Sequence, residues 1–236
     1  MSEKKFDIYF EFNYSKLNLA AFNKLTNSLE YYKEQNYLSY FNDYNELNFE
    51  NLDKLLEENV IKFEKSSKEF VKDIYLIIET PQSTTIELSV SKNNEGDQIS
   101  KEEAMYLVQD AKQQILKSNQ NFRILHIIVE NYVLDDNRYK YLPLDKKCNK
   151  FSIDLKFICF PKDLVKNFEK FFIKHQIYIN RIICLNYVKE FNIDGDLNIC
   201  EKARSIVNGI NKQEVVSISK EPEKKGFFEK LFHFFK

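Results

Sequence analysis

The order of apolar patterns between residues 84 and 185 restricts the fold more than any other feature of this sequence. Thr84–Lys92 alternates strictly between apolar and polar residues, which is typical of a strand with one buried face. Ser100-Lys-Glu-Glu103 has the spacing of a capping box, so a helix begins there. The patterns that follow indicate strands at 123–134 and 151–160, a helix after Pro161 and a strand at 177–185. This β-α-β-β-α-β order predicts a split βαβ arrangement, an antiparallel sheet with both helices on one face.

The first 79 residues show a different order of elements. Residues 6–12 and 16–22 indicate two strands joined by a hairpin at 13–15, and a third strand is expected within 28–33. Apolar residues at helical spacing from 48 to about 70 predict a helix, and residues 74–78 predict a further strand. The fold class is therefore α+β, with a β-β-β-α-β segment first. We expect four regions along the chain: 1–79, 80–188, a linker with a possible short helix at 189–222, and a terminal helix at 223–236.

Glycine is scarce, and this excludes the familiar nucleotide-binding loops. The chain of 236 residues has four glycines, where average usage of about 7% would give roughly sixteen. Phosphate-binding loops need glycine so that backbone N–H groups can approach the anion, and no such motif occurs here. The net charge of −1 gives no basic field for nucleic acid. We expect no cofactor and no nucleic-acid partner.

The residues that most often carry catalysis are dispersed. His126, His175 and His233 lie far apart without a metal-binding spacing, and His126 is interpreted as a hydrogen-bonded core histidine. Cys159 and Cys184 fall in apolar runs typical of buried thiols. We predict no catalytic or metal-ligating residues and no enzymatic activity. An enzyme with an unrecognised site remains an alternative.

The C-terminal residues have the pattern of a short amphipathic helix. Six apolar residues from Phe227 to Phe235 share one helical face, and residues 220–225 read as a polar tether. At about 1.5 Å per residue the segment is too short to span a bilayer but suits a membrane interface. A helix docked on a protein surface is the alternative. The predicted membrane-binding residues are Lys224, Lys225, Phe227, Phe228, Lys230, Leu231, Phe232, Phe234, Phe235 and Lys236.

Several of these patterns together resemble the bacterial cell-division protein FtsA, an actin-like family. The run from Arg123 to Asp135, R-I-L-H-I-I-V-E-N-Y-V-L-D, is similar to the family's "ILHxxPxxYxLD" strand. The likeness continues through 151–160 and 162–183 and back over 98–118. Residues 224–232 resemble the family's membrane-targeting helix. The resemblance implies a partial actin-like subdomain at 1–79 and an inserted subdomain of the SHS2 type (strand–helix–strand–strand) at 80–188.

Departures from the family limit what the resemblance implies. The first phosphate loop of the family, D-x-G-[ST]-S-K, would fall on residues 11–16, where Asn13 replaces the glycine. The second actin-like half has no room before the tail, so ATP binding and contact with the ring protein FtsZ do not carry over. We therefore expect a non-catalytic adaptor of cell division, with unidentified division proteins as partners and self-association possible.

The expected location follows from the same sequence features. Nothing at the N-terminus resembles a signal peptide, and no run of 18 apolar residues occurs. We expect a cytoplasmic protein that is peripheral on the cytoplasmic face of the inner membrane. The alternative function is an SHS2-type interaction module of another envelope assembly, such as a pilus-assembly system.

Overall fold

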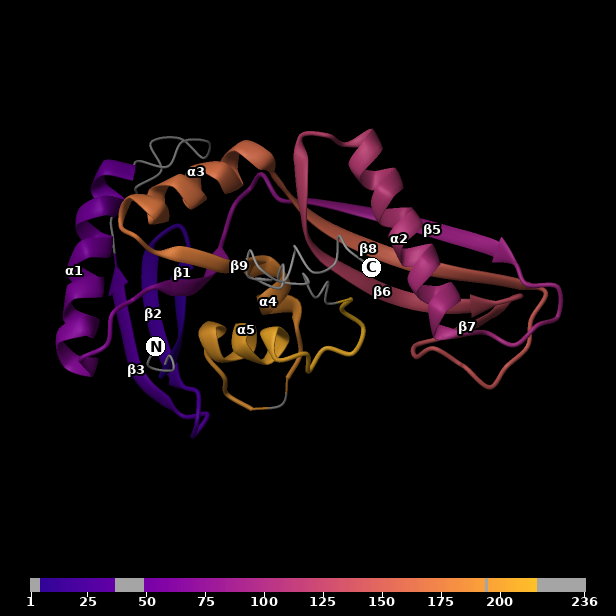
Figure 1. The fold of residues 1–236 in the computed structure, drawn as a ribbon, viewed down its shortest axis with the longest axis horizontal. Helices are drawn as coiled ribbons and strands as arrows, with labels where there is room; N and C mark the ends of the chain where they lie inside the picture. The colour runs from indigo at the N-terminus through magenta and orange to yellow at the C-terminus, as the bar shows by residue number, and fades with distance from the viewer. Residues whose placement is uncertain (1–4, 37–48, 194, 216–236) are drawn as a thin grey trace, which may run out of the picture.

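The computed structural model describes residues 5–36, 49–193 and 195–215, and these residues form a mixed α+β fold with two sheets. Figure 1 shows the two sheets side by side along the long axis of the molecule. The first sheet has five strands in the order β3-β2-β1-β4-β9, and the second has four in the order β5-β8-β6-β7. Each sheet has its own buried apolar cluster, so the described chain has two packed cores.

The first sheet combines an antiparallel meander with parallel strands. β1 (Phe6–Phe12) pairs antiparallel with β2 (Lys16–Asn23), and β2 pairs with β3 (Leu29–Asn36). β4 (Asp73–Ile78) is parallel to β1, and β9 (Tyr178–Cys184) is parallel to β4. A parallel partner requires a crossover connection. The helix α1 (Phe49–Ser67) supplies part of the connection to β4, and α3 (Lys162–Lys174) precedes β9.

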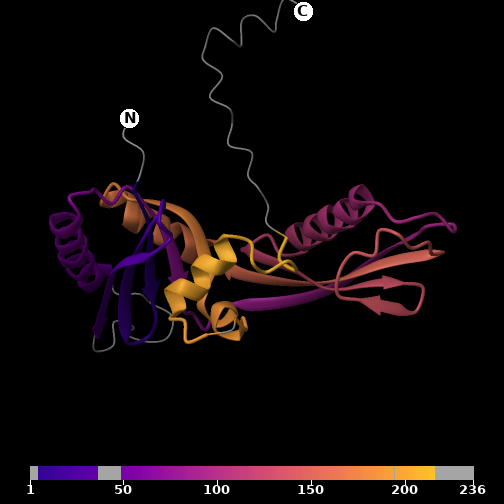
Figure 2. The same cartoon turned by 90° about the horizontal axis from the view of Figure 1, so that it is seen from below.

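Helices cover both faces of the first sheet because its central strands are apolar on both sides. On one face, Phe10 and Phe12 of β1 contact Phe172 of α3, with ring centroids 6.0 Å and 6.1 Å away. The opposite face receives α4 (Leu185–Glu190) and α5 (Ile199–Val207), and the Arg204 guanidinium lies over the Phe22 ring. Figure 2 shows α5 in front of the sheet and α3 behind it.

The second sheet has a helix on one face only. β5 (Thr84–Asn93) pairs antiparallel with β8 (Lys150–Pro161), which also pairs with β6 (Phe122–Leu134); β7 (Asn137–Tyr139) adds three residues beside the end of β6. The helix α2 (Lys101–Ser118) packs an apolar stripe against this sheet: Ala104, Leu107, Val108, Ala111 and Ile115. In the strand predicted at 151–160, every second side chain is buried: Phe151, Ile153, Leu155 and Phe157. Among the described residues, no helix covers the larger part of the other face.

Most of the predicted helices and strands are confirmed, whereas their arrangement in sheets is confirmed only in part. Ser100 caps α2 through a capping box with Glu103, and the hairpin at 13–15 joins β1 and β2. Pro161 precedes α3, and Asn208 ends α5. The sequence did not predict the short strand β7 or the short helix α4.

The expectation that 84–185 forms one β-α-β-β-α-β sheet is wrong for its last two elements. The structure places β9 in the first sheet, beside β4, and α3 over the first core. The reason is the apolar surface that the first sheet offers. Ile182 and Ile183 are buried beside β4, and Phe168 and Phe172 of α3 pack on Phe12. The chain therefore leaves the first sheet after β4, builds the second sheet, and returns.

Residues 123–134 are apolar on both faces in their first half, a composition typical of a central strand, but they do not form the central strand of the second sheet. β8 is the strand with long partners on both sides, whereas β6 has only the short β7 and a few C-terminal residues beyond it. The first half of β6 is apolar on both faces because it lies against the first core, where Leu125 and Ile128 pack. Burial at the junction of the sheets, not a central position, explains its composition.

Candidate functional site

The junction of the two sheets contains a buried polar cluster drawn from four parts of the chain. His126 lies on β6, Arg181 on β9, Tyr187 on α4, and Glu214 on the segment that follows α5. Glu214 reaches the junction because Val129 N–H donates to the Gln213 carbonyl and Val215 N–H donates to the Ile127 carbonyl, each at 2.8 Å. The last described residues thus pair with the outer edge of β6 and carry a carboxylate into the interior.

His126 has both ring nitrogens occupied. The Cys184 N–H donates to Nε2 over 3.1 Å, so Nδ1 carries the hydrogen of the neutral ring and donates to Glu214 Oε1 at 2.7 Å. Burial lowers the pKa of His126, and this outweighs the opposing effect of Glu214. A buried neutral histidine with two partners cannot act as a base towards a bound substrate. The sequence interpretation of His126 as a hydrogen-bonded core residue is confirmed.

Glu214 is the acceptor at the centre of the cluster. Its carboxylate accepts from the Arg181 guanidinium and from the Tyr187 hydroxyl, which lies 3.1 Å away. The Asn211 side-chain amide in turn donates to the Tyr187 oxygen over 2.7 Å. Burial alone would raise the pKa of Glu214, but the hydrogen bond from His126 and the charge of Arg181 hold it below its usual value. Glu214 is therefore an ionised, fully partnered group that ties the segment to both sheets.

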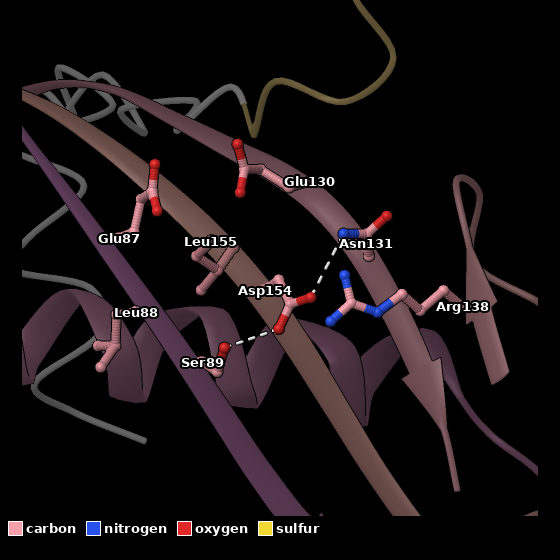
Figure 3. Close-up of a pocket in the computed structure, with 8 residues that line it drawn as sticks. All are labelled: Glu87, Leu88, Ser89, Glu130, Asn131, Arg138, Asp154 and Leu155. Carbon is pink, nitrogen blue, oxygen red and sulfur yellow. Dashed lines mark hydrogen bonds between the residues drawn. The ribbon is translucent and has the colours of Figure 1, made fainter. Parts of the chain in front are cut away.

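The open face of the second sheet offers a shallow polar pocket (Figure 3). Asp154 of β8 lies at its centre, where it accepts from the Ser89 hydroxyl at 2.7 Å and from the Asn131 amide at 3.3 Å. Glu87 of β5, Glu130 of β6 and Arg138 of β7 also line the pocket. Three carboxylates against one guanidinium make this pocket acidic. The Ser89 hydroxyl bonds to a carboxylate, and the residues that line the pocket include no histidine or cysteine.

The hairpin between β1 and β2 stands where the phosphate loop of the resembled family would fall. Asn13 Oδ1 accepts from the N–H groups of Ser15 and Lys16 at 3.0 Å and 2.8 Å. The Asn13 amide donates to Glu11, a buried carboxyl that also accepts from Asn18 at 2.7 Å. Burial raises the pKa of Glu11, against the effect of these two amides. Two backbone donors that a phosphate would need are already bound to a side chain of the hairpin.

The remaining candidates for chemistry occupy structural positions. All four cysteines are buried, and burial raises the pKa of Cys159 to about 11, so its thiolate is disfavoured. His175 ends α3, and its Nε2 lies 2.8 Å from Asp53 on α1, where it joins two helices. Within residues 5–36, 49–193 and 195–215, no three His, Cys, Asp or Glu side chains are grouped to hold a metal ion.

The predicted membrane-binding residues lie outside the described residues. All ten fall between Lys224 and Lys236, so their role in membrane binding stays a prediction. Among the described helices, none combines the length and the apolar character needed to cross a bilayer.

The sequence patterns did not indicate three residues of the junction cluster: Arg181, Tyr187 and Glu214. Glu214 lies in the region expected to be a linker, 189–222, and its only local signal is a carboxylate directly before Val215-Val216.

Comparison with known proteins gives similarity in structure only. No family model matches the chain, and no curated protein matches its sequence. The structure is similar to part of a PilM-PilN type IV pilus biogenesis complex, with a TM-score of 0.49, 6% identity and 79% of this chain covered. A protein of Bacteroides thetaiotaomicron with an actin-like ATPase fold and unknown function has a TM-score of 0.34, 11% identity and 80% coverage.

A third similar structure is the cytoplasmic domain of EpsL, an inner membrane component of the type II secretion system of Vibrio cholerae. Its TM-score is 0.39, with 6% identity and 80% of this chain covered. The chain covers 49%, 57% and 60% of the three structures, less than two thirds of each.

The junction cluster predicts a large difference between two arginine substitutions. Arg181→Ala should destabilise the protein by about 3–5 kcal/mol, because it leaves the buried Glu214 carboxylate without its cation. Arg123→Ala is the matched control, since Arg123 pairs with Glu169 at the surface and its loss should cost less than about 1 kcal/mol. Urea denaturation of both variants measures this difference. Equal losses would show that the junction does not depend on the ion pair.

Proposed function

We propose that this chain is a non-catalytic adaptor of a bacterial envelope assembly that binds partner proteins through the open face of its second sheet. The proposal rests on the contrast between the hairpin and the junction, which are closed to ligands, and the open face of the second sheet. The hairpin at 13–15 satisfies its own donors, and the junction histidine is buried and partnered. The sheet face around Asp154, by contrast, is polar and accessible.

As the assembly that the adaptor serves, we favour a pilus or secretion system over the cell-division machinery. The resemblance of residues 123–135 to the FtsA strand motivates cell division. Two of the three similar structures are named for pilus biogenesis and for type II secretion, and none of the three is named for division. These likenesses concern the fold, so identification of the partner must decide between the two assemblies.

The proposal includes an SHS2-type subdomain and a membrane anchor. β5, α2, β6 and β8 follow one another as strand, helix, strand and strand, with only the three-residue β7 added. This order supports an SHS2-type insertion between β4 and α3. Residues 224–236 would attach the adaptor to the cytoplasmic face of the inner membrane, which the sequence pattern of the tail supports.

Partner capture on the open face is the direct test of the adaptor role. A photo-crosslinking amino acid at Ser152, on the open face of β8, should capture a specific protein in cells. The same group at Lys65, in the last turn of α1, is the control and should not capture it. Mass spectrometry then identifies a pilus, secretion or division protein. Equal capture at both positions would contradict binding through the open face.

Nucleotide should leave the protein unchanged, because Asn13 already occupies the hairpin donors. We expect ATP or ADP with Mg²⁺ at millimolar concentration to give no shift in melting temperature. A ligand at 100 times its Kd would add about 2.7 kcal/mol to the free energy of unfolding, which corresponds to a rise of about 5 °C or more. A reproducible rise of that size would refute the nucleotide-free assignment.

The tail should act as a weak, reversible membrane anchor. Phe228→Glu with Phe232→Glu puts two charges on the apolar face and should abolish co-sedimentation with anionic liposomes. Phe228→Leu with Phe232→Leu is the control and should still sediment. The melting temperature of the body should be the same in both variants. Glutamate variants that still sediment would rule out the anchor, whereas a much lower melting temperature would indicate a docked helix.

A further inference from the structure

The four sheet edges of the described chain differ in how far they are protected. An unpaired strand edge can pair with another strand, and proteins prevent this with charges, bulges or covering segments. β3 carries Glu30, Lys33 and Glu34 and pairs with β2 through a bulge. β9 lies beside β6 at the junction, where Cys184 N–H donates to His126. The edge of β6 is covered by β7 and by residues 213–215.

Among the described residues, β5 has no bulge and no covering segment, and it carries fewer charges than β3. It is the outermost strand of the second sheet (Figure 1), ten residues long, and its pairing with β8 is regular from Thr84 to Asn93. Of its two charged residues, Lys92 is held by Glu103 of α2, which leaves Glu87 as the charge on the open side. β5 is therefore a regularly paired edge with one unpaired charge, of the kind that accepts another strand.

The hydrogen-bond pattern shows which backbone groups of β5 are available. Asn94 N–H donates to the Asn149 carbonyl, one step beyond the last paired residues, Asn93 and Lys150. Antiparallel bonding alternates along a strand, so the even-numbered residues of β5 bond to β8. The odd-numbered residues direct N–H and C=O away from the sheet, and their side chains are exposed on the open face: Thr85, Glu87, Ser89, Ser91 and Asn93.

We propose that β5 pairs with β5 of a second copy of this chain, antiparallel and centred on Ser89. The two four-stranded sheets would then form one continuous eight-stranded sheet related by a two-fold axis. This inference does not depend on the adaptor function, because it rests on the edge strand alone. The open face around Asp154 stays accessible in the pair, since the second copy adds at the edge.

Self-complementarity favours a second copy as the occupant. With Ser89 on the axis, Glu87 faces Ser91 of the other copy and Thr85 faces Asn93, which places polar groups opposite one another on the open face. On the side of α2, Leu88 faces Val90, so the two strands add apolar contacts. The two Glu87 residues are then four positions apart along the strands, about 13 Å, beyond the screening length of about 8 Å at physiological salt.

Neighbouring registers are less favourable. Centring the pair on Leu88 brings the two Glu87 side chains into diagonal contact, where like charges repel. Centring it on Val90 leaves a single apolar pair, Val90 with Val90, and places Lys92 opposite Leu88. The register centred on Ser89 places Lys92 opposite Ile86, but it makes two pairs of Leu88 with Val90 and keeps the two Glu87 side chains apart.

Proline at position 89 gives a specific test in the full-length protein. Ser89→Pro removes an N–H that points away from β8, so the ladder within the molecule keeps its hydrogen bonds while the edge loses a donor. Ser89→Ala is the matched control, because it removes the hydroxyl and keeps the N–H. Sedimentation at about 100 µM should show a concentration-dependent dimer for the wild type and for Ser89→Ala. The dimer Kd of Ser89→Pro should be at least about tenfold weaker, a difference of about 1.4 kcal/mol.

Cysteine crosslinking tests the register independently of any folding defect in the proline variant. The four native cysteines are buried, so Ser89→Cys introduces an exposed thiol. A short bismaleimide should join two Ser89→Cys chains, because paired positions lie about 5.5 Å apart. It should join Glu87→Cys chains poorly. A monomeric wild type, a Ser89→Pro dimer as tight as the wild type, or equal crosslinking at both positions would each overturn the proposal.

Discussion

The contact between Arg181, Glu214 and His126 holds the two sheets in one arrangement. The chain passes from the first sheet to the second after β4 and returns through α3, so covalent connection alone leaves the sheets free to hinge. A carboxylate on the segment after α5 binds a guanidinium on β9 and an imidazole on β6. These groups stabilise the fold only as a set, because each buried charge would be costly without its partner. The open face of β8 and the free edge of β5 are presented by this arrangement.

The scarcity of glycine has a structural counterpart in the hairpin at 13–15. A glycine-rich turn would leave its N–H groups free for an anion. Here Asn13 turns its side chain back onto Ser15 and Lys16, and Glu11 is buried against Asn18. At the position where the resemblance would place a phosphate loop, the chain has a self-contained turn. Side-chain hydrogen bonds within the chain stabilise it.

Local patterns identified most elements, because their signals lie within a few residues. The alternation of Thr84–Lys92 and the capping box of Ser100 and Glu103 appear in the structure as expected. The sheet to which β9 belongs could not be found in this way, since Ile182 and Ile183 would suit either sheet. Glu214 was missed for a related reason. Its three partners come from β6, β9 and α4, between 27 and 88 residues away, and nothing near it in the sequence announces them.

The described chain ends at the junction of the sheets, and the proposed pairing of β5 would therefore bring two proposed anchors into one assembly. Residues 213–215 pair with β6 at the junction, so residues 216–236 begin there. A single tail can bury only a few aromatic rings in an interface and must offset the entropy of its own ordering, so its binding would be transient. Two copies joined through β5 would carry two tails on one rigid sheet. Once the first tail is bound, the second binds at a high effective concentration, and attachment strengthens without any new contact. Pairing at the sheet edge would then control membrane residence while the open face remains available to a partner protein.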